Sequence, residues 1–258
     1  MEQRFSAGNG MNKKIKNKLR FLPIIAVILV GIAFAVSYLL SYSKATTTAR
    51  AALAGNEQVN VVSEEGYYRF EPTQNETPET GILFYPGGKV DEIAYAPLAS
   101  RLAECGYSVF LVHMPFHLAV FDSNAAEDIM EANPDLSHWI IMGHSLGGAM
   151  AANYVSGHEN EIEGLVLLAA YSTKDLSQSD IKVLSMYGSN DGVLNMKKYQ
   201  SNKKNLPKDM TEYIIDGGNH AGYGYYGAQN GDNVAEISQR EQQEEVVDLF
   251  LCVFGNKE

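Results

Sequence analysis

Short apolar runs alternate with helical segments along most of this chain, from residue 81 to residue 254. The apolar runs are Gly81–Tyr85, Ser108–His113, Trp139–Met142, Gly164–Ala170, Ile181–Tyr187 and Met210–Ile215. Helical spacing of apolar residues occurs over Tyr95–Glu104, Asn124–Glu131, Ser145–Ser156 and Glu241–Phe254. Strands that are apolar throughout are buried on both faces, which is typical of parallel sheets. The alternation therefore predicts an α/β fold, with a mostly parallel central sheet and helices on both of its faces.

Two further runs of β-forming residues, Val59–Val62 and Tyr67–Phe70, precede this region and predict an opening hairpin. Apolar residues make up 45% of the 258 residues, so a sizeable core can form. We therefore expect one domain over residues 58–258. The small and polar residues 44–57 are expected to be a linker in front of it.

The N-terminal part of the chain contains an uncharged apolar stretch, residues 21–43. A helix needs about 20 such residues to cross a bilayer, and Pro23 falls in the first turn, where proline costs little. Six basic residues and one acid precede the stretch, within residues 1–20. Positive charge favours the cytoplasmic side of a membrane span. We therefore expect a single-pass transmembrane anchor over 21–43 in the cell membrane, a cytoplasmic segment 1–20 and a domain outside the cytoplasm.

Two other interpretations of this stretch stay open. A signal peptide would be cleaved and the protein secreted, and the small residues around Ser43-Lys44-Ala45 offer a cleavage site. The apolar core of a signal peptide is usually shorter, at roughly 7–15 residues. The second interpretation is a buried core helix, and the basic flank on one side only argues against it.

Charge is unevenly spread along the chain. The formal net charge is −11, of which residues 1–20 carry +5 and the remainder −16. A body that acidic is repelled by phosphate backbones, so we expect no nucleic acid partner.

The sequence GHSLG at residues 143–147 follows one expected strand and opens an expected helix, Ser145–Ser156. This strand–turn–helix context is what a nucleophile elbow requires. The serine of such an elbow occupies a sharp turn that exposes its hydroxyl group, and the glycines leave room for the turn. Ser145 is therefore the candidate nucleophile. The motif alone is weak, because a glycine-rich turn can also lack chemistry.

A serine hydroxyl needs a base to act as a nucleophile at neutral pH. Asp191 follows the expected strand Ile181–Tyr187, and His220 follows Met210–Ile215. Carboxyl ends of parallel strands meet at one edge of a sheet, which is also the edge of Ser145. The order Ser, Asp, His along the chain predicts a catalytic triad. Each downstream residue alone would be an ordinary loop residue, and their joint order and placement favour the triad.

The oxyanion of an acyl-transfer intermediate needs two backbone N–H donors. One is expected from Leu146, the residue after the nucleophile. The other is expected from the loop Pro86–Lys89, after the strand Gly81–Tyr85. Gly88 is the first choice for this oxyanion-hole donor and Lys89 is the second.

The chain resembles the α/β-hydrolase superfamily over residues 58–258. The segments FYPGGKVDEIAYAPLASRLAECGY, GHSLGGAMA, LSMYGSNDGV and GGNHAGYGYYG carry the resemblance. Pro86 replaces the histidine of the usual oxyanion loop, a departure that bears on the geometry of the donors. The chain looks like the small, lidless branch that includes dienelactone-hydrolase-like proteins, which often use cysteine where this chain has Ser145. Only 46 positions separate Ser145 from Asp191, which leaves no room for a cap domain there.

The resemblance implies a serine hydrolase that cleaves a carboxylic ester in a small-molecule acyl substrate, with no cofactor, and the stretch 21–43 is expected to anchor it in the membrane. We also expect no metal ion, because Asp122, Asp191 and Asp232 are too scattered to suggest a metal site. Amidases, thioesterases and acyltransferases use the same triad, and sequence does not separate them. A non-catalytic binding module with this fold is the alternative from another class, and it would require neither Asp191 nor His220.

Some residues have two interpretations. Tyr223, Tyr225 and Tyr226 either line the substrate cleft or pack their loop on the body. Phe116 and His117 follow a strand at the active edge, where they form pocket wall or serve structure alone. In the family's fold, Cys105 and Cys252 lie on helices that cover the same sheet face. They form either a disulfide, if the domain is extracytoplasmic, or two separate buried thiols.

Overall fold

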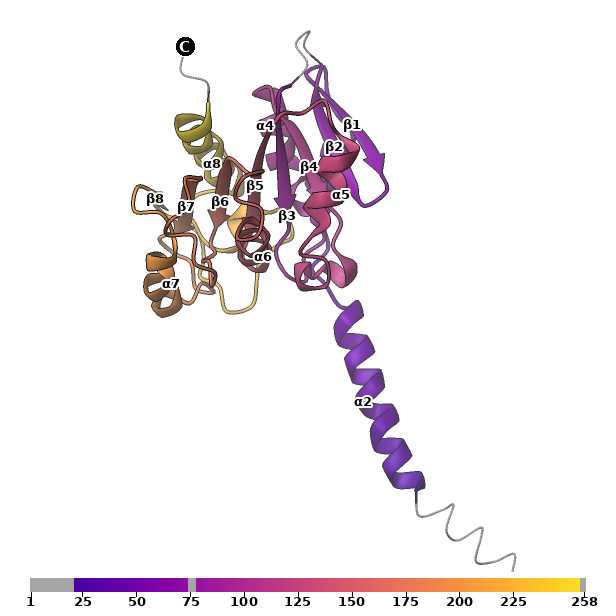
Figure 1. Ribbon diagram of the computed structural model, residues 1–258. Coiled ribbons are helices and arrows are strands. Elements are labelled where there is room, and N and C mark those ends of the chain that lie inside the picture. The colour runs from indigo at the N-terminus through magenta and orange to yellow at the C-terminus, as the bar shows by residue number, and fades with distance from the viewer. Residues whose placement is uncertain (1–20, 74–77, 256–258) are drawn as a thin grey trace, which may run out of the picture. The chain divides into compact units, whose positions relative to one another are not determined.

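The computed structural model describes residues 21–73 and 78–255, so the expected cytoplasmic segment 1–20 lies outside the described residues (Figure 1). The chain divides into two compact units, and the boundary falls between Ser41 and Tyr42.

The first unit contains the helix α2 (Leu22–Leu40), which has Pro23 in its first turn. No residue from Pro23 to Leu40 is buried, and this segment is long and apolar enough to cross a membrane. A signal sequence near the N-terminus passes the same test. The helix ends before the expected end of the anchor at Ser43, because Ser43 belongs to the second unit and forms a β-bridge with Val90 there.

The second unit is built on one sheet, in which eight strands of the described residues have the order β1-β2-β4-β3-β5-β6-β7-β8. The strands are β1 (Val59–Glu64), β2 (Tyr67–Pro72), β3 (Thr80–Tyr85), β4 (Ser108–Val112), β5 (His138–His144), β6 (Gly164–Leu168), β7 (Lys182–Gly188) and β8 (Thr211–Ile215). The hairpin β1–β2 is antiparallel, and β2 is antiparallel to β4. From β4 to β8 every pairing is parallel, which confirms the predicted mostly parallel sheet.

Helices cover both faces of this sheet (Figure 1). The helices α3 (Thr47–Ala51), α4 (Ala96–Glu104) and α8 (Gln239–Phe254) contribute to one apolar core cluster, and α5 (Ala125–Ala132) and α6 (Leu146–Val155) contribute to the other. Successive side chains of a strand point to opposite faces. In β3, Ile82 and Phe84 therefore join the first cluster, and Leu83 and Tyr85 join the second.

The register aligns the carboxyl ends of the parallel strands. Gly143 near the end of β5 pairs with Tyr85 at the end of β3 and with Leu167 in β6. Gly188 at the end of β7 pairs with Ile215 at the end of β8. The loops that follow β3, β5, β7 and β8 consequently leave from a common edge.

The expectation of a linker over residues 44–57 is wrong. This segment forms α3 and packs on the domain, with Ala45 and Ala49 buried in the first core cluster. The backbone N–H of Thr46 donates to the carbonyl of Tyr225 over 2.8 Å. Alanines are small enough to pack closely, and their low hydrophobicity hid this contact from pattern analysis.

Two other expectations differ from the structure. The helix α7 (Met196–Asn202) lies between β7 and β8 and was not predicted, because only Tyr199 of its seven residues is buried. Cys105 and Cys252 are both free and both exposed, so neither the disulfide nor the pair of buried thiols is found.

Candidate active site

Ser145 occupies the turn between β5 and α6. Its backbone has φ 52° and ψ −118°, in the left-handed half of conformational space that a residue with a side chain seldom adopts. Its N–H donates to the carbonyl of Leu168 over 2.9 Å, which fixes the turn against β6. The side chain is half-buried. The sequence motif thus folds as a strained strand-to-helix turn, as predicted for an elbow.

The turn depends on two glycines at close approaches. A Cβ atom at Gly143 would lie 2.6 Å from the backbone of Gly147 and Gly148. A Cβ atom at Gly147 would overlap the carbonyl oxygens of Tyr85 and Pro86, at the start of the expected oxyanion loop. The elbow and the oxyanion loop therefore pack backbone to backbone.

Gly147→Ala is expected to lower the free energy of unfolding by about 3 kcal/mol or more. The added methyl group meets backbone atoms, which cannot move aside as a flexible side chain can. Denaturant unfolding followed by circular dichroism measures the loss. Gly157→Ala is the matched control, since its Cβ atom would lie 3.7 Å from the nearest heavy atom, the carbonyl oxygen of Tyr154. Equal stability of the two variants would refute the close approach.

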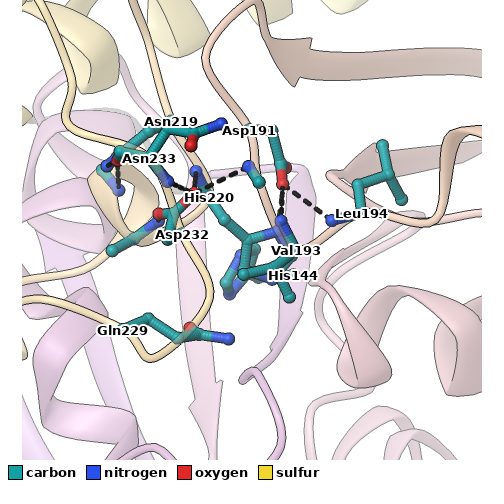
Figure 2. A network of polar contacts seen from close by, with 12 residues as sticks. His144, Asp191, Val193, Leu194, Asn219, His220, Gln229, Asp232 and Asn233 are labelled. Carbon is teal, nitrogen blue, oxygen red and sulfur yellow. Dashed lines mark hydrogen bonds and ion pairs between the residues drawn. The ribbon is translucent and has the colours of Figure 1, made fainter.

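Asp191 and His220 meet at the carboxyl ends of β7 and β8. His220 Nδ1 lies 2.8 Å from Asp191 Oδ2, and each side chain is only 1% exposed. The other carboxylate oxygen accepts the N–H groups of Val193 at 2.8 Å and Leu194 at 2.7 Å (Figure 2). A carboxylate oxygen only accepts, so Nδ1 carries the imidazole proton and Nε2 has the lone pair in neutral His220.

The structure brings two of the three expected triad residues into direct contact. Among the described residues, no hydrogen bond joins Ser145 to His220, and the buried Nε2 atom of His220 has no hydrogen-bond partner. The neighbour of Ser145, His144, packs its ring against that of His220, with 4.6 Å between the ring centroids. The imidazole of His220 therefore lies against the residue that directly precedes Ser145 in the elbow.

His144 joins the oxyanion loop to the histidine loop, a role that sequence analysis missed. The N–H of Gly87 donates to the hydroxyl oxygen of Tyr95 over 3.1 Å, and that hydroxyl lies 2.8 Å from Nδ1 of His144. Burial raises the pKa of Tyr95, so its hydroxyl keeps a proton to donate. Burial and the nearby His220 hold the pKa of His144 well below its usual value. His144 is therefore neutral at neutral pH and places no positive charge beside His220.

Asp232 holds the two loops of the acid–base pair together (Figure 2). Its carboxylate accepts the N–H of Gly192 at 2.9 Å, beside Asp191. It also accepts the N–H groups of His220 at 3.3 Å, Ala221 at 2.8 Å and Asn233 at 3.0 Å. No local pattern around residue 232 signals this role, because its partners come from two distant loops.

The oxyanion-hole expectation is refined in one respect. Gly88 lies against Leu146, since a Cβ atom at Gly88 would be 2.8 Å from a methyl group of that leucine. Among the described residues, no hydrogen bond uses the N–H of Gly88. The N–H of Lys89, the second choice, donates to the carbonyl of His117 over 2.7 Å. Gly88 is therefore the better candidate donor in this loop.

The tyrosines after His220 pack their loop on the body. Tyr223 and Tyr226 are buried in the first core cluster, and Tyr225 packs against it. The N–H of Tyr225 donates to the carbonyl of Ala94 over 2.8 Å. Of their two interpretations, the structural one is therefore found.

A family model described as the alpha/beta hydrolase family matches residues 81–244, a range that includes the elbow and the Asp191–His220 pair. The chain belongs to the alpha/beta hydrolase family. Among solved structures, this alpha/beta hydrolase is similar to a predicted CIB-like hydrolase from Thermoplasma acidophilum. The identity is 16% and the TM-score 0.53, over 75% of this chain and 97% of that chain, so the likeness concerns the fold alone. No curated protein matches the chain.

Membership of the alpha/beta hydrolase family makes the protein a hydrolase. The strained elbow at Ser145 and the buried Asp191–His220 pair stand at the carboxyl edge of its parallel sheet, where open α/β sheets bind their ligands.

Proposed function

We propose that the protein is a membrane-anchored serine hydrolase that cleaves a carboxylic ester through an acyl-enzyme. The observation that carries the proposal is the buried contact of 2.8 Å between His220 and Asp191, next to the strained turn of Ser145. A non-catalytic binding module needs no such pair. Two-step acyl transfer requires a nucleophile, a base and a group that orients the base, and we assign these roles to Ser145, His220 and Asp191.

In the first half-reaction, Ser145 Oγ attacks the carbonyl carbon of the ester while His220 Nε2 takes the hydroxyl proton. The carbon–oxygen bond to the alcohol then breaks, and His220 returns the proton to the leaving oxygen. Water attacks the acyl-enzyme in the second half-reaction; His220 takes its proton and gives it to Ser145 as the acid departs. Asp191 keeps the Nδ1–H tautomer and stabilises the imidazolium cation.

The negative oxygen that forms in each step is assigned to the backbone donors Gly88 and Leu146. Leu146 is the first residue of α6, so its N–H lies at the positive end of the helix. Loss of one such donor typically lowers kcat by about 10²–10³-fold. Gly88 lies against the side chain of Leu146, which supports the choice of these two neighbouring residues as the pair of donors.

The apolar helix α2 supports the membrane anchor. The segment Pro23–Leu40 is apolar and not buried by the protein, so a lipid environment would cover its side chains. The basic residues within 1–20 favour a cytoplasmic N-terminus. The catalytic domain is then extracytoplasmic.

The test of this function is labelling of the full chain in isolated membranes with a fluorophosphonate probe, which reacts with activated serines. We expect labelling of the wild type and none of Ser145→Ala. The labelled protein must stay in the membrane pellet after washing at alkaline pH. A folded wild type that does not label would refute the hydrolase mechanism, and labelled protein in the supernatant would refute the anchor. Turnover of p-nitrophenyl esters but not of the matching anilides separates esterase from amidase.

A further inference from the structure

Exposed apolar side chains gather in the segment after β4, residues 115–121, called here the apolar loop. Phe116, Val120 and Phe121 are 49%, 50% and 54% exposed. The rings of Phe116 and Phe121 contact each other edge to face, with 5.6 Å between centroids. The loop sequence, PFHLAVF, has no acidic residue in an otherwise acidic domain. Exposed apolar side chains gathered in this way are typical of surfaces that bind a protein or a membrane.

The apolar loop is held in a fixed conformation. Phe116 and His117 have φ angles of 54° and 55°, each of which costs about 1–3 kcal/mol. His117 Nδ1 lies 3.4 Å from a carboxylate oxygen of the buried Glu92, and the carbonyl of His117 accepts the N–H of Lys89. The contacts of His117 therefore fix the apolar loop to the domain, while the rings of Phe116 and Phe121 stay exposed.

The position of Tyr42 in the chain indicates that the apolar loop meets a membrane. The ring of Tyr42 lies against that of His117 in the apolar loop, with 3.9 Å between ring centroids and a tilt of 30°. Tyr42 follows the last residue of α2, Leu40, by two positions in the sequence. In a chain anchored by α2, Tyr42 is thus among the first residues to leave the bilayer, at the depth where tyrosine is enriched in membrane proteins.

Charge limits which part of the acidic domain can meet a membrane. The chain after residue 20 has a net charge of −16, which anionic headgroups repel. The apolar loop has no carboxylate of its own, so it enters the boundary between headgroups and acyl chains without desolvating one.

We infer that the apolar loop and Tyr42 form a membrane-contacting surface, which buries Phe116, Val120 and Phe121 in the outer boundary of the bilayer. The loop also borders the candidate oxyanion hole, because Leu118 would lie 3.6 Å from a Cβ atom at Gly88. This second step rests on the proposed function: a hydrolase whose site borders a membrane-contacting surface acts on acyl esters of amphiphiles held in the membrane.

Bromine quenching in vesicles tests the contact without any need for turnover. The full chain is reconstituted in phosphatidylcholine vesicles whose acyl chains are brominated near the headgroup. Phe121→Trp adds a fluorophore in the apolar loop, and Val234→Trp is the matched control in another loop, at a residue that is 88% exposed. The native Trp139 is buried and is common to both variants.

We expect the emission of Phe121→Trp to be shifted to shorter wavelength and quenched several-fold more than that of Val234→Trp. Equal quenching of the two variants would overturn the inference, as would a chain that does not float with the vesicles. Shielding of Phe121→Trp from aqueous acrylamide without bromine quenching would instead indicate a second copy or another protein on the loop.

A second arm tests the substrate class. The double variant Val120→Ser/Phe121→Ser is expected to hydrolyse a long-chain ester in vesicles at least about tenfold more slowly than Val234→Ser. Both variants should hydrolyse a soluble short-chain ester at the same rate. An equal loss on the two substrates would contradict the assignment. If no ester is hydrolysed by the wild type, the proposed function fails, and the quenching result still decides the membrane contact.

Discussion

Replacing His220 with alanine is expected to lower kcat/KM for a short ester by about 10⁴–10⁶-fold. The imidazole is the only group of the described site that accepts and returns the proton of Ser145 in the proposed mechanism. Its Nε2 atom has no other hydrogen-bond partner among the described residues. Initial rates with p-nitrophenyl acetate measure the loss, and the rate of fluorophosphonate labelling should fall with it.

The matched control is His158→Ala. His158 follows α6, where Nδ1 lies 2.9 Å from the carbonyl oxygen of Tyr154, and it has no contact with His220 among those the structure describes. This variant should keep kcat/KM within about twofold of the wild type, because surface changes away from a site have small effects. A loss below about tenfold in folded His220→Ala would mean that another group serves as the base.

Asp232→Ala is expected to lower kcat by about 10²-fold, the usual cost of a displacement of about 1 Å at reacting groups. The variant leaves four backbone N–H groups without an acceptor, including those of Gly192 and His220. The loops that carry the acid and the base then lose their common partner. Because Asp232 positions these loops and does not contact the ester, KM should change much less than kcat.

Two variants sharpen this result. Asp232→Asn keeps one carbonyl oxygen, which retains the acceptor of Gly192, and should recover part of kcat. Asp180→Asn makes the same change of charge at an exposed residue in front of β7, and should leave kcat unchanged. Thermal unfolding of each variant separates misplacement from loss of the fold. If Asp232→Ala keeps the wild-type kcat, the loops are positioned by their other contacts.

The strands and the candidate catalytic residues were predictable because their signals are local. An apolar run such as Gly164–Leu168 is too short for a typical helix, and its length favours a buried strand. The order of Ser145, Asp191 and His220, each directly after a strand, needs only the rule that parallel strands end at one edge.

The supporting residues were not predictable, because long-range contacts define them. Asp232 lies in a stretch without periodicity, and its partners lie about 10 and 40 positions away in the chain. Tyr95 was expected only as the start of a helix, yet its buried hydroxyl links Gly87 to His144. Tertiary packing determines such roles, and the pattern of residues along the sequence does not predict which distant residues pack together.

The segment that packs ahead of the sheet also affects the order in which the protein folds. Residues 42–50 are synthesised before their partners: Ser43 and Arg50 bind the loop that carries Val90 and Asp91, and Thr46 binds Tyr225. If the domain is exported behind the proposed anchor, Ser43 and Arg50 meet their partners once residues 89–91 have crossed, whereas Thr46 stays without its partner until Tyr225 has crossed. The helix α3 is thus fixed at both ends only when the loop after His220 has docked, so the first helix of the domain is among the last to reach its final place.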